Sequence, residues 1–516
     1  MAPDTNTTWQ LRAVIEGSPS LVEASSGRQT RECGLPSTSC KAVTDPPRIE
    51  KMNQNTVASL LELATKSVLS NQSTGIRALE LLPKHLFLPL FVTALKERQK
   101  KMLTEIVKRW PFQCLHIGSL NIEDSPLEIF EALVDGLQIV SDENISSGGP
   151  QLQVLDLREN MDCELTCYYR ASSPFCLSSC VYAHNAIPNA EESQNRDRGL
   201  EMGALESEHA SSRRIIELIV NISFRRGFRM NQFLYFLKRK IRQSSGNLHL
   251  CCRKVYIRNM CSHTRRLRFL NPACINCLEV NRVHLRKVTR LFPQLICLDK
   301  LILTARPFQY CEGRSFRIFV EWLGKMAILR DLSLSSFYLG GHLEELLSVL
   351  LSPLDSLSLR FCNLSTVDVT VLSESSQLTH ITRLNLSDNN LFKESYYPFR
   401  MLLRRASRTL QHLEIRNCKL TDAILSALLS ELSCCSELCV FCFSSNPISM
   451  SALKGFLQRV AACLKLQEVI YPIPVHCYGD NSYILNYERL SEVQYQVKLM
   501  LQVVKREDMY WSTSTV

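Results

Sequence analysis

Four cysteines in a polar tract have the residue type and order of a zinc site. Cys163, Cys167, Cys176 and Cys180 follow the spacing C-x3-C-x8-C-x3-C, and His184 comes shortly after them. A structural zinc ion takes four thiolate or imidazole ligands. The two pairs lack the tight CxxC spacing of common zinc sites, and the tract reads as a loop. We therefore expect free thiols here and no metal.

Residue combinations that carry out catalysis are not found in the sequence. There is no phosphate-binding glycine loop, no nucleophile elbow, no His-Glu metal helix and no pair of acids in a recognisable context. We therefore expect a protein that is not an enzyme and that needs no cofactor.

A short motif has the chemistry of a docking helix. Ser59, Leu60, Ala64 and Val68 match Ser/Thr/Pro-Leu-x3-Cys/Ser/Ala-x3-apolar, the pattern of the elongin-binding box of ubiquitin-ligase substrate receptors. Helix positions i, i+4 and i+8 share one face, and a leucine beside a small residue suits insertion into an apolar groove. An ordinary amphipathic helix produces the same spacing, so a core or capping helix stays open as the alternative.

A second motif follows in the order expected of such receptors. Leu82, Pro83, Leu86 and Leu90 match apolar-Pro-x2-apolar-x3-apolar, which looks like the cullin-2 box that accompanies the elongin-binding box. Proline is tolerated mainly in the first turn of a helix, so the prolines divide this region into short helices. We predict a helical segment over residues 51–110 that bears both motifs.

The elements that position these motifs come from an internal repeat. The pattern apolar-x-x-apolar-x-apolar-x-x-Asn/Cys/apolar-x-apolar recurs at steps of 23 to 31 residues, close to the leucine-rich-repeat period. The segments start at Ile275, Leu298, Leu329, Leu354, Ile381, Leu410 and Leu438. Weaker copies occupy residues 112–122, 152–160 and 252–260, and one begins at Leu466.

Each repeat predicts one strand followed by one helix. Apolar and polar residues alternate at the centre of each copy, which is typical of a strand with one buried face, and helical patterns such as 421–432 lie between the copies. Units of this kind cannot bury their apolar faces alone, but they can when stacked. We predict an α/β leucine-rich-repeat solenoid (a horseshoe) with a concave parallel sheet, helices on the convex side and an N-terminal helical cap.

The same pattern predicts the remaining organisation of the chain. Residues 1–50 are rich in Ser, Thr, Pro and Gly, and we expect a disordered tail there. The solenoid is predicted over residues 111–475, with a loop insertion at 161–212, and a C-terminal helical cap and tail over 476–516.

Polar strand positions that flank the central apolar pair would face the concave side. They are Glu279, Asn281, Lys300, Asp331, Ser358, Arg360, Arg383, Asn385, His412, Glu414 and Arg416. A stripe of mixed sign favours a protein ligand over a phosphate backbone. A solvated face without a dedicated partner is the simpler alternative for any one of these residues.

Composition limits the partners and the compartment. The 516 residues carry 60 Lys+Arg and 50 Asp+Glu, a net charge of +10 without a concentrated basic patch, so we expect no nucleic acid as the main partner. No apolar run approaches the ~20 residues of a membrane-spanning helix, and no signal peptide is visible. The 22 cysteines then predict reduced thiols in the cytosol or the nucleus, not a secreted protein.

Several sequence blocks resemble one known family, the PRAME family, whose leucine-rich-repeat proteins are named for preferential expression in melanoma. The blocks are ALELLPKHLFLPLF (78–91), WPFQCL (110–115), LQVLDLREN (152–160), LHLCCRKVYI (248–257), GGHLEELLSVLLSPLDSLSLRFCNL (340–364) and CFSSNPISMSALKGFL (442–457). They occur in family order. The resemblance implies germline or tumour-restricted expression and roles in transcriptional repression, apoptosis, differentiation and proliferation. It also implies that elongins B and C bridge the protein to cullin 2.

The resemblance also draws attention to LxxLL motifs, which dock on nuclear receptors. Matches lie at 343–347, 347–351 and 425–429. A repeat helix must bury leucines at i, i+3 and i+4 against its neighbours, so we expect these leucines to be core residues.

We therefore expect a substrate-recognition adaptor of a cullin-2/elongin ubiquitin ligase, with an unidentified protein as substrate. The alternatives are a binding-only solenoid, which acts as a transcriptional corepressor or a protein inhibitor, and a purely structural germ-cell protein.

Overall fold

A computed structural model describes most of the chain. The described residues are 60–112, 114–117, 127–137, 152–158, 216–224, 228–244, 246–259, 270–478 and 484–513, and they belong to one compact unit, Ala58–Val516. The predicted tail at 1–50, the loop insertion at 161–212 with its cysteines, and Ser59 lie outside the described residues.

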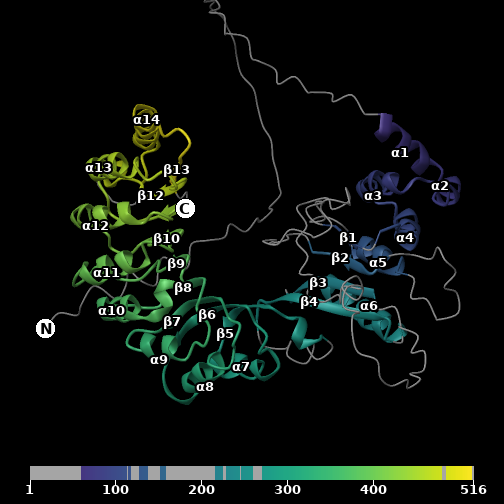
Figure 1. Ribbon diagram of the computed structural model, residues 1–516, viewed down its shortest axis with the longest axis horizontal. Coiled ribbons are helices and arrows are strands. Elements are labelled where there is room, and N and C mark those ends of the chain that lie inside the picture. Colours follow the sequence, from purple (N-terminus) through teal and green to yellow (C-terminus); the bar gives the residue numbers. More distant parts are fainter. Residues whose placement is uncertain are drawn as a thin grey trace, which may run out of the picture. The chain divides into compact units, whose positions relative to one another are not determined.

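The strands of the described residues form one parallel sheet of thirteen, in which each strand pairs with the ones before and after it in the chain. The order is therefore that of a solenoid, as the repeat predicts (Figure 1). The strands are β1 Cys114–His116, β2 Val154–Asp156, β3 Ile216–Phe224, β4 Leu248–Ile257, β5 Cys277–Val283, β6 Lys300–Tyr310, β7 Asp331–Tyr338, β8 Ser356–Arg360, β9 Arg383–Asn385, β10 His412–Glu414, β11 Val440–Cys442, β12 Glu468–Tyr471 and β13 Tyr510–Thr513.

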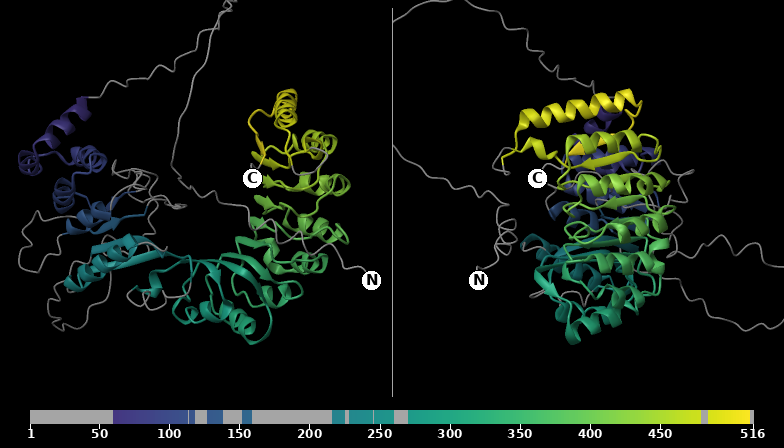
Figure 2. Two further views of the ribbon diagram at one scale, coloured as in Figure 1. Left: turned by 180° about the vertical axis from the view of Figure 1, so that it is seen from behind. Right: turned by 90° about the vertical axis from the view of Figure 1, so that its left-hand side faces the viewer.

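Helices connect the strands and cover one side of the sheet. Figures 1 and 2 show β5–β12 on the concave side and α7–α13 on the convex side. The helices are α1 Leu60–Ser70, α2 Gln72–Ala78, η1 Lys84–Leu86, α3 Phe87–Lys96, α4 Lys100–Lys108, α5 Leu127–Asp135, α6 Phe228–Gln243, η6 Pro272–Cys274, α7 Leu285–Val288, η7 Phe292–Gln294, α8 Gly313–Leu323, α9 Leu343–Ser348, α10 Thr366–Glu374, η8 Ser376–Thr379, α11 Tyr397–Ala406, α12 Asp422–Cys434, α13 Met450–Val460, η9 Val475–Cys477 and α14 Tyr487–Val503. None of these helices combines the length and the apolar character needed to cross a bilayer.

The strand pattern of the repeats is confirmed, but two strands escaped the sequence pattern. β3 has apolar residues on both faces: Leu218 joins the main core, whereas Ile219 packs with Val154 and Cys251 on the other side. β3 alternates apolar and polar residues except at Ile219, but Ser223 and Arg225 stand where the repeat pattern requires Asn, Cys or an apolar residue. β13 lies in the region expected to hold only a helical cap and tail; its Trp511 packs against Tyr471.

Alternation along each strand builds the core. In β8, Leu357 and Leu359 are fully buried against the helices, while Ser356, Ser358 and Arg360 face the other way. The leucines of successive repeats form one continuous core along the array. Burial of an apolar side chain contributes about 2 kcal/mol, and only neighbouring repeats can supply that burial.

Buried asparagines join one repeat to the previous one at the turn after the strand. Oδ1 of Asn389 accepts hydrogen bonds from the backbone N–H groups of Cys362 (2.9 Å) and Leu364 (3.0 Å), both in the preceding repeat. Its Nδ2 donates to the carbonyl oxygen of Leu359 at 2.7 Å. Asn446 makes the same contacts two repeats later, where its Oδ1 accepts a hydrogen bond from the backbone N–H of Cys418 at 2.9 Å. The asparagine thus satisfies backbone groups that the bend leaves unpaired.

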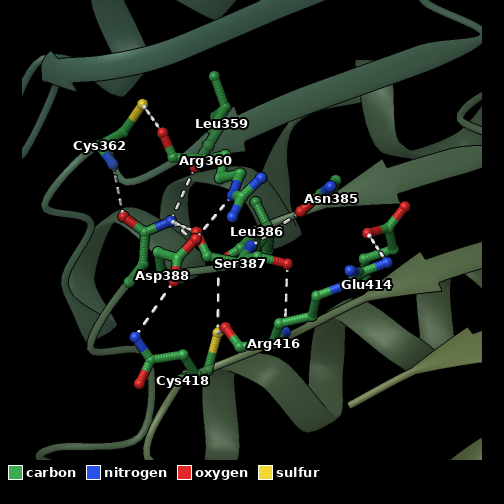
Figure 3. Close-up of polar contacts among 12 residues, drawn as sticks. Leu359, Arg360, Cys362, Asn385, Leu386, Ser387, Asp388, Glu414, Arg416 and Cys418 are labelled. Carbon is green, nitrogen blue, oxygen red and sulfur yellow. Dashed lines mark hydrogen bonds and ion pairs between the residues drawn. The ribbon is translucent and has the colours of Figure 1, made fainter. Parts of the chain in front are cut away.

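Cysteine takes the asparagine position in the alternate repeats (Figure 3). The Sγ of Cys418 lies 3.4 Å from the carbonyl oxygen of Leu386, and that of Cys362 lies 3.3 Å from the carbonyl oxygen of Leu334. Burial raises the pKa of both thiols to about 12. Each therefore stays protonated and can donate only a weak hydrogen bond to the previous repeat.

Replacing Asn389 by alanine should destabilise the array strongly. The substitution leaves two buried N–H groups without an acceptor, and we expect the free energy of unfolding in urea to fall by about 3 kcal/mol. Asn390→Ala removes an exposed side chain next to it and should cost less than about 0.5 kcal/mol. Equal effects of the two substitutions would contradict the role given to Asn389.

A buried carboxylate links two convex helices. Glu431 of α12 is buried, and its Oε1 lies 2.6 Å from Nε of Arg400 and 3.1 Å from a guanidinium nitrogen of Arg404, both on α11. Burial by itself raises the pKa of Glu431, but hydrogen bonds from Ser430 and Arg400 outweigh it and lower this pKa from 4.5 to about 2.

Glu431 should make stability depend on pH in acid. A carboxyl group whose pKa is lowered on folding stabilises the fold above its unfolded pKa, and this contribution disappears as the pH falls from about 4.5 towards 2. We expect Glu431→Gln to lower the free energy of unfolding at pH 7 by on the order of 2 kcal/mol. The gap to the wild type should narrow below pH 4.5, whereas the exposed Glu344→Gln should show no such trend. A gap that stays constant with pH would refute this.

Candidate protein-binding surfaces

The concave side of β5–β10 carries the polar side chains that the repeat pattern singled out. Strand pairing aligns Lys300 with Asp331, Asp331 with Ser356, and Arg383 with His412. All eleven predicted residues are exposed or half-buried, while the leucines next to them are buried. The structure therefore brings the predicted set together on one face, and whether a partner binds there stays a prediction.

Ion pairs hold charges of this face in place, some between neighbouring strands and one across an intervening strand. The carboxylate of Asp331 lies 3.0 Å from Nζ of Lys300 on one side and 3.3 Å from a guanidinium nitrogen of Arg383 on the other. Because its side chain is only 16% exposed, Asp331 is the best shielded member of this group. A carboxylate that lies between two cations restricts the side-chain freedom of both cations.

Further pairs extend the pattern along the face. Nζ of Lys254 lies 3.0 Å from Glu279, and Nδ2 of Asn281 donates to the hydroxyl of Tyr256 at 2.8 Å. Figure 3 shows two more pairs, Arg360 with Asp388 at 2.7 Å and Arg416 with Glu414 at 3.2 Å. The sequence did not reveal Lys254, Tyr256 and Asp388 as members, because their roles follow from strand register.

His412, on β10 at one end of this face, is a titratable group with a shifted pKa. Burial, and then the charge of Arg383, lowers the pKa of its imidazole below 6.5, so the ring is neutral at neutral pH. Its Nδ1 is buried and has no hydrogen-bond partner among the described residues, and the same is true of Nε of Arg416. These atoms are polar groups that a bound partner could satisfy.

The motif of the predicted docking helix lies on α1. Leu60 is 86% exposed, and Ala64 is exposed one turn later, whereas Val68 is half-buried. The opposite face of α1 holds the helix to its neighbours through buried Thr65 and Leu69. Thr65 accepts a hydrogen bond from the hydroxyl of Thr93 on α3 at 3.3 Å. The leucine of the motif therefore points away from the core.

The second motif lies between α2 and α3. Pro83 is exposed at the start of η1, and Leu82 and Leu86 are half-buried. Leu90 is a correction to the predicted set of contact residues: it is 2% exposed and packs in the core, so it positions α3 and cannot touch a partner directly.

Most leucines of the LxxLL matches lie in the core, as the repeat pattern predicts, but Leu351 of the match at 347–351 is 67% exposed, and Leu350 and Leu429 are half-buried. Leu343, Leu346 and Leu347 on α9 are buried, and so are Leu425 and Leu428 on α12. A buried leucine cannot enter another protein's groove without local unfolding.

A polar concave sheet, a leucine core and a helical N-terminal module define a leucine-rich-repeat protein. The model of the PRAME C-terminal domain matches residues 216–516, and that of the PRAME N-terminal domain matches residues 57–165. The chain belongs to the PRAME family.

Full-length relatives agree with this assignment. Bovine leucine-rich repeat-containing protein 14 is 29% identical over 497 residues, which cover 88% of this chain and 97% of the relative. Human PRAME family member 13 is 32% identical over 462 residues, covering 87% and 92%. Among solved structures, an internalin from Listeria monocytogenes matches with a TM-score of 0.31 and 15% identity. The match covers 58% of this chain and 87% of that chain. The fold assignment rests on the pairing of the strands and not on this match.

Asp331 should contribute more to stability than a more exposed acid of the same region. We expect Asp331→Asn to lower the free energy of unfolding by about 1 kcal/mol, because Lys300 and Arg383 lose their shared anion. The matched substitution Asp355→Asn breaks a 3.8 Å pair at a side chain that is 47% exposed, and should cost less than about 0.5 kcal/mol. Urea unfolding at low salt and at 1 M salt measures both, and the Asp331 effect should shrink at high salt. If the two substitutions cost the same, Asp331 has no special role.

Proposed function

We propose that this protein is a substrate-recognition adaptor of a cullin-2 ubiquitin ligase, joined to the ligase by elongins B and C. The observation that carries the proposal is the orientation of α1, whose motif residues Leu60 and Ala64 are exposed while its other face is buried. A helix that merely capped the array would turn its leucines towards the core.

The start of α1 offers the kind of surface on which a partner docks. Leu61 and Leu63 are also exposed, so three leucines gather within one turn of Leu60. Clustered exposed apolar side chains mark interaction sites on soluble proteins. Leucine anchors would enter an apolar groove on elongin C, and the small side chain of Ala64 would let the two backbones approach closely.

The segment between α2 and α3 would complete the assembly. Exposed Pro83 and half-buried Leu82 and Leu86 would contact cullin 2 after the elongins have bound. The concave face would hold the substrate, so that a ubiquitin-loaded enzyme brought by the ligase reaches the lysines of the substrate. This chain would supply proximity and no reacting group, which agrees with a non-enzymatic role. Effects on transcription, apoptosis, differentiation or proliferation would follow from the proteins that it selects.

A binding-only solenoid is the alternative, as a corepressor or a protein inhibitor. The mixed-charge concave face would suit a binding-only protein equally well. A nuclear-receptor contact through the LxxLL matches finds little support, because each match has at least one leucine buried in the core, such as Leu343, Leu347 and Leu425. Elongin binding therefore decides between the two functions.

Co-purification with elongins B and C tests the proposal. The wild-type chain should retain both elongins, and the double substitution Leu60→Glu, Ala64→Phe should lose them, because the charge and the bulk block entry into an apolar groove. Circular dichroism and the melting temperature should stay unchanged, since both side chains are exposed.

An exposed leucine elsewhere provides the matched control. Leu464 is 81% exposed between α13 and β12, and Leu464→Glu should keep both elongins. If the wild type retains no elongin, or if the double variant binds as well as the wild type, the adaptor proposal fails and the binding-only solenoid takes its place.

A further inference from the structure

An aromatic cluster lies at the carboxyl ends of three neighbouring strands. The ring of Phe308 on β6 meets Tyr338 of β7 at a centroid distance of 6.0 Å and Phe361, just after β8, at 5.4 Å, both edge to face. Tyr310 stacks on Tyr338 at 5.4 Å. Tyr310 is nevertheless 62% exposed and Phe361 41% exposed. We call these four residues the aromatic patch.

The patch faces away from the leucine core. Strand pairing sets Gln309 beside Phe337 and Tyr310 beside Tyr338, and successive residues of a strand point to opposite faces. Phe337 is fully buried against the helices, so Tyr338 faces the other side. β6 carries extra residues between Thr304 and Gln309, which shift its register against β7. This irregularity brings Phe308 to the rings of the next two repeats.

The backbone of Phe361 is strained. Its φ is +54°, in the left-handed region that bulky residues avoid. The turns of other repeats place small or polar residues in the same conformation: Ser336 at +64°, Asp388 at +62° and Asn417 at +49°. Asparagine, aspartate and serine suit this turn, so a phenylalanine in it is unfavourable for folding alone. Strain of this kind, held at an exposed site, points to function.

Unpaired arginines lie at the same end of the adjoining strands. Arg258 follows β4, Arg282 lies near the end of β5, and Arg306 lies two residues before Phe308. All three are exposed, and none of them is within ion-pair distance of an acid among the described residues. They contrast with the charges farther down the strands, where Lys254, Lys300 and Arg383 have carboxylate partners.

We propose that the aromatic patch and these arginines bind an acidic, extended segment of a partner protein through one aromatic or aliphatic anchor side chain. The anchor would pack on the exposed rings, which are the residue type that dominates binding energy at interfaces. Carboxylates beside the anchor would pair with Arg258, Arg282 and Arg306, which complement their charge. The nearby carboxylates of Glu279 and Asp331 disfavour the continuous phosphate backbone of a nucleic acid. If the bound segment belongs to a substrate of the ligase, that identification rests on the proposed function, whereas the binding itself does not.

Fluorescence anisotropy with the full chain tests the proposal. The probe is a fluorescein-labelled peptide of glutamate and serine residues with one central tryptophan. Two matched peptides replace every glutamate by lysine, or the tryptophan by serine, and a single-stranded oligothymidylate represents nucleic acid. We expect the acidic tryptophan peptide to bind at least about tenfold more tightly than each of the others. Equal binding of the lysine peptide, or tighter binding of the oligonucleotide, overturns the proposal.

Two substitutions separate a binding role from a structural one. Phe361→Asn should weaken binding of the acidic peptide at least about tenfold while the melting temperature stays the same or rises, because asparagine suits the left-handed turn. Arg306→Glu should weaken binding similarly without a change in melting temperature, since its side chain is exposed. Tyr495→Asn, at an exposed tyrosine on α14, is the control and should bind as the wild type does.

Contrary results are equally clear. If Phe361→Asn lowers the melting temperature and leaves the affinity of the peptide unchanged, Phe361 is a packing residue and the proposal is wrong. The Leu60→Glu, Ala64→Phe variant should keep peptide binding, and Phe361→Asn should keep the elongins. These two results distinguish a failure of binding at the aromatic patch from a failure of the adaptor function.

Discussion

A strand–helix unit of this protein cannot satisfy itself, and the rest of the structure follows from that constraint. Its leucines find apolar neighbours only in the adjacent units, and in some units the backbone of the turn finds its acceptor in the asparagine of the next one, as Asn389 shows. Stacking is therefore obligatory, and it uses one face of every strand. The other face takes no part in the leucine core, so its side chains are less constrained by packing and could serve a partner.

The charged side chains on the concave face fall into two groups, those with an ion-pair partner and those without one among the described residues. Towards the middle of the strands, acids such as Asp331 hold cations of nearby strands in fixed positions. At the carboxyl ends of β4–β6, arginines such as Arg306 form no ion pair with an acid among the described residues and lie at the same end of the sheet as the exposed rings. The ion pairs hold the side chains in the middle of the strands in place. The positive charge at the carboxyl ends has no ion-pair partner among the described residues. The helical module adds a separate exposed leucine surface on α1, so the proposed recognition of a substrate and the proposed recruitment of a ligase would use different elements.

The repeat period and the alternation of leucines were sufficient to predict the solenoid, its strand order and the concave position of all eleven polar residues. Register effects were not predictable in this way. The ion partners of Arg360 and Glu279 come from neighbouring repeats, and the aromatic patch depends on an irregularity within β6. β3 was missed because Ser223 and Arg225 break the end of the repeat pattern, although its apolar and polar residues alternate except at Ile219. Leu90 was taken for a contact residue because spacing alone cannot say which side of a short helix is buried.

Asparagine and cysteine alternate at the turn position of the four repeats that begin at Leu354, Ile381, Leu410 and Leu438, and this alternation joins these repeats in couples. Asn389 fastens its repeat to the one before it, and Asn446 does the same one couple later, but Cys418 between them offers only a weak thiol donor. Ser387 and Asp388 bridge that gap with hydrogen bonds to the backbone of Arg416 and the side chain of Asn417 (Figure 3). Under a stretching force, these repeats are expected to separate two at a time. The contacts made by the cysteine thiols should break first.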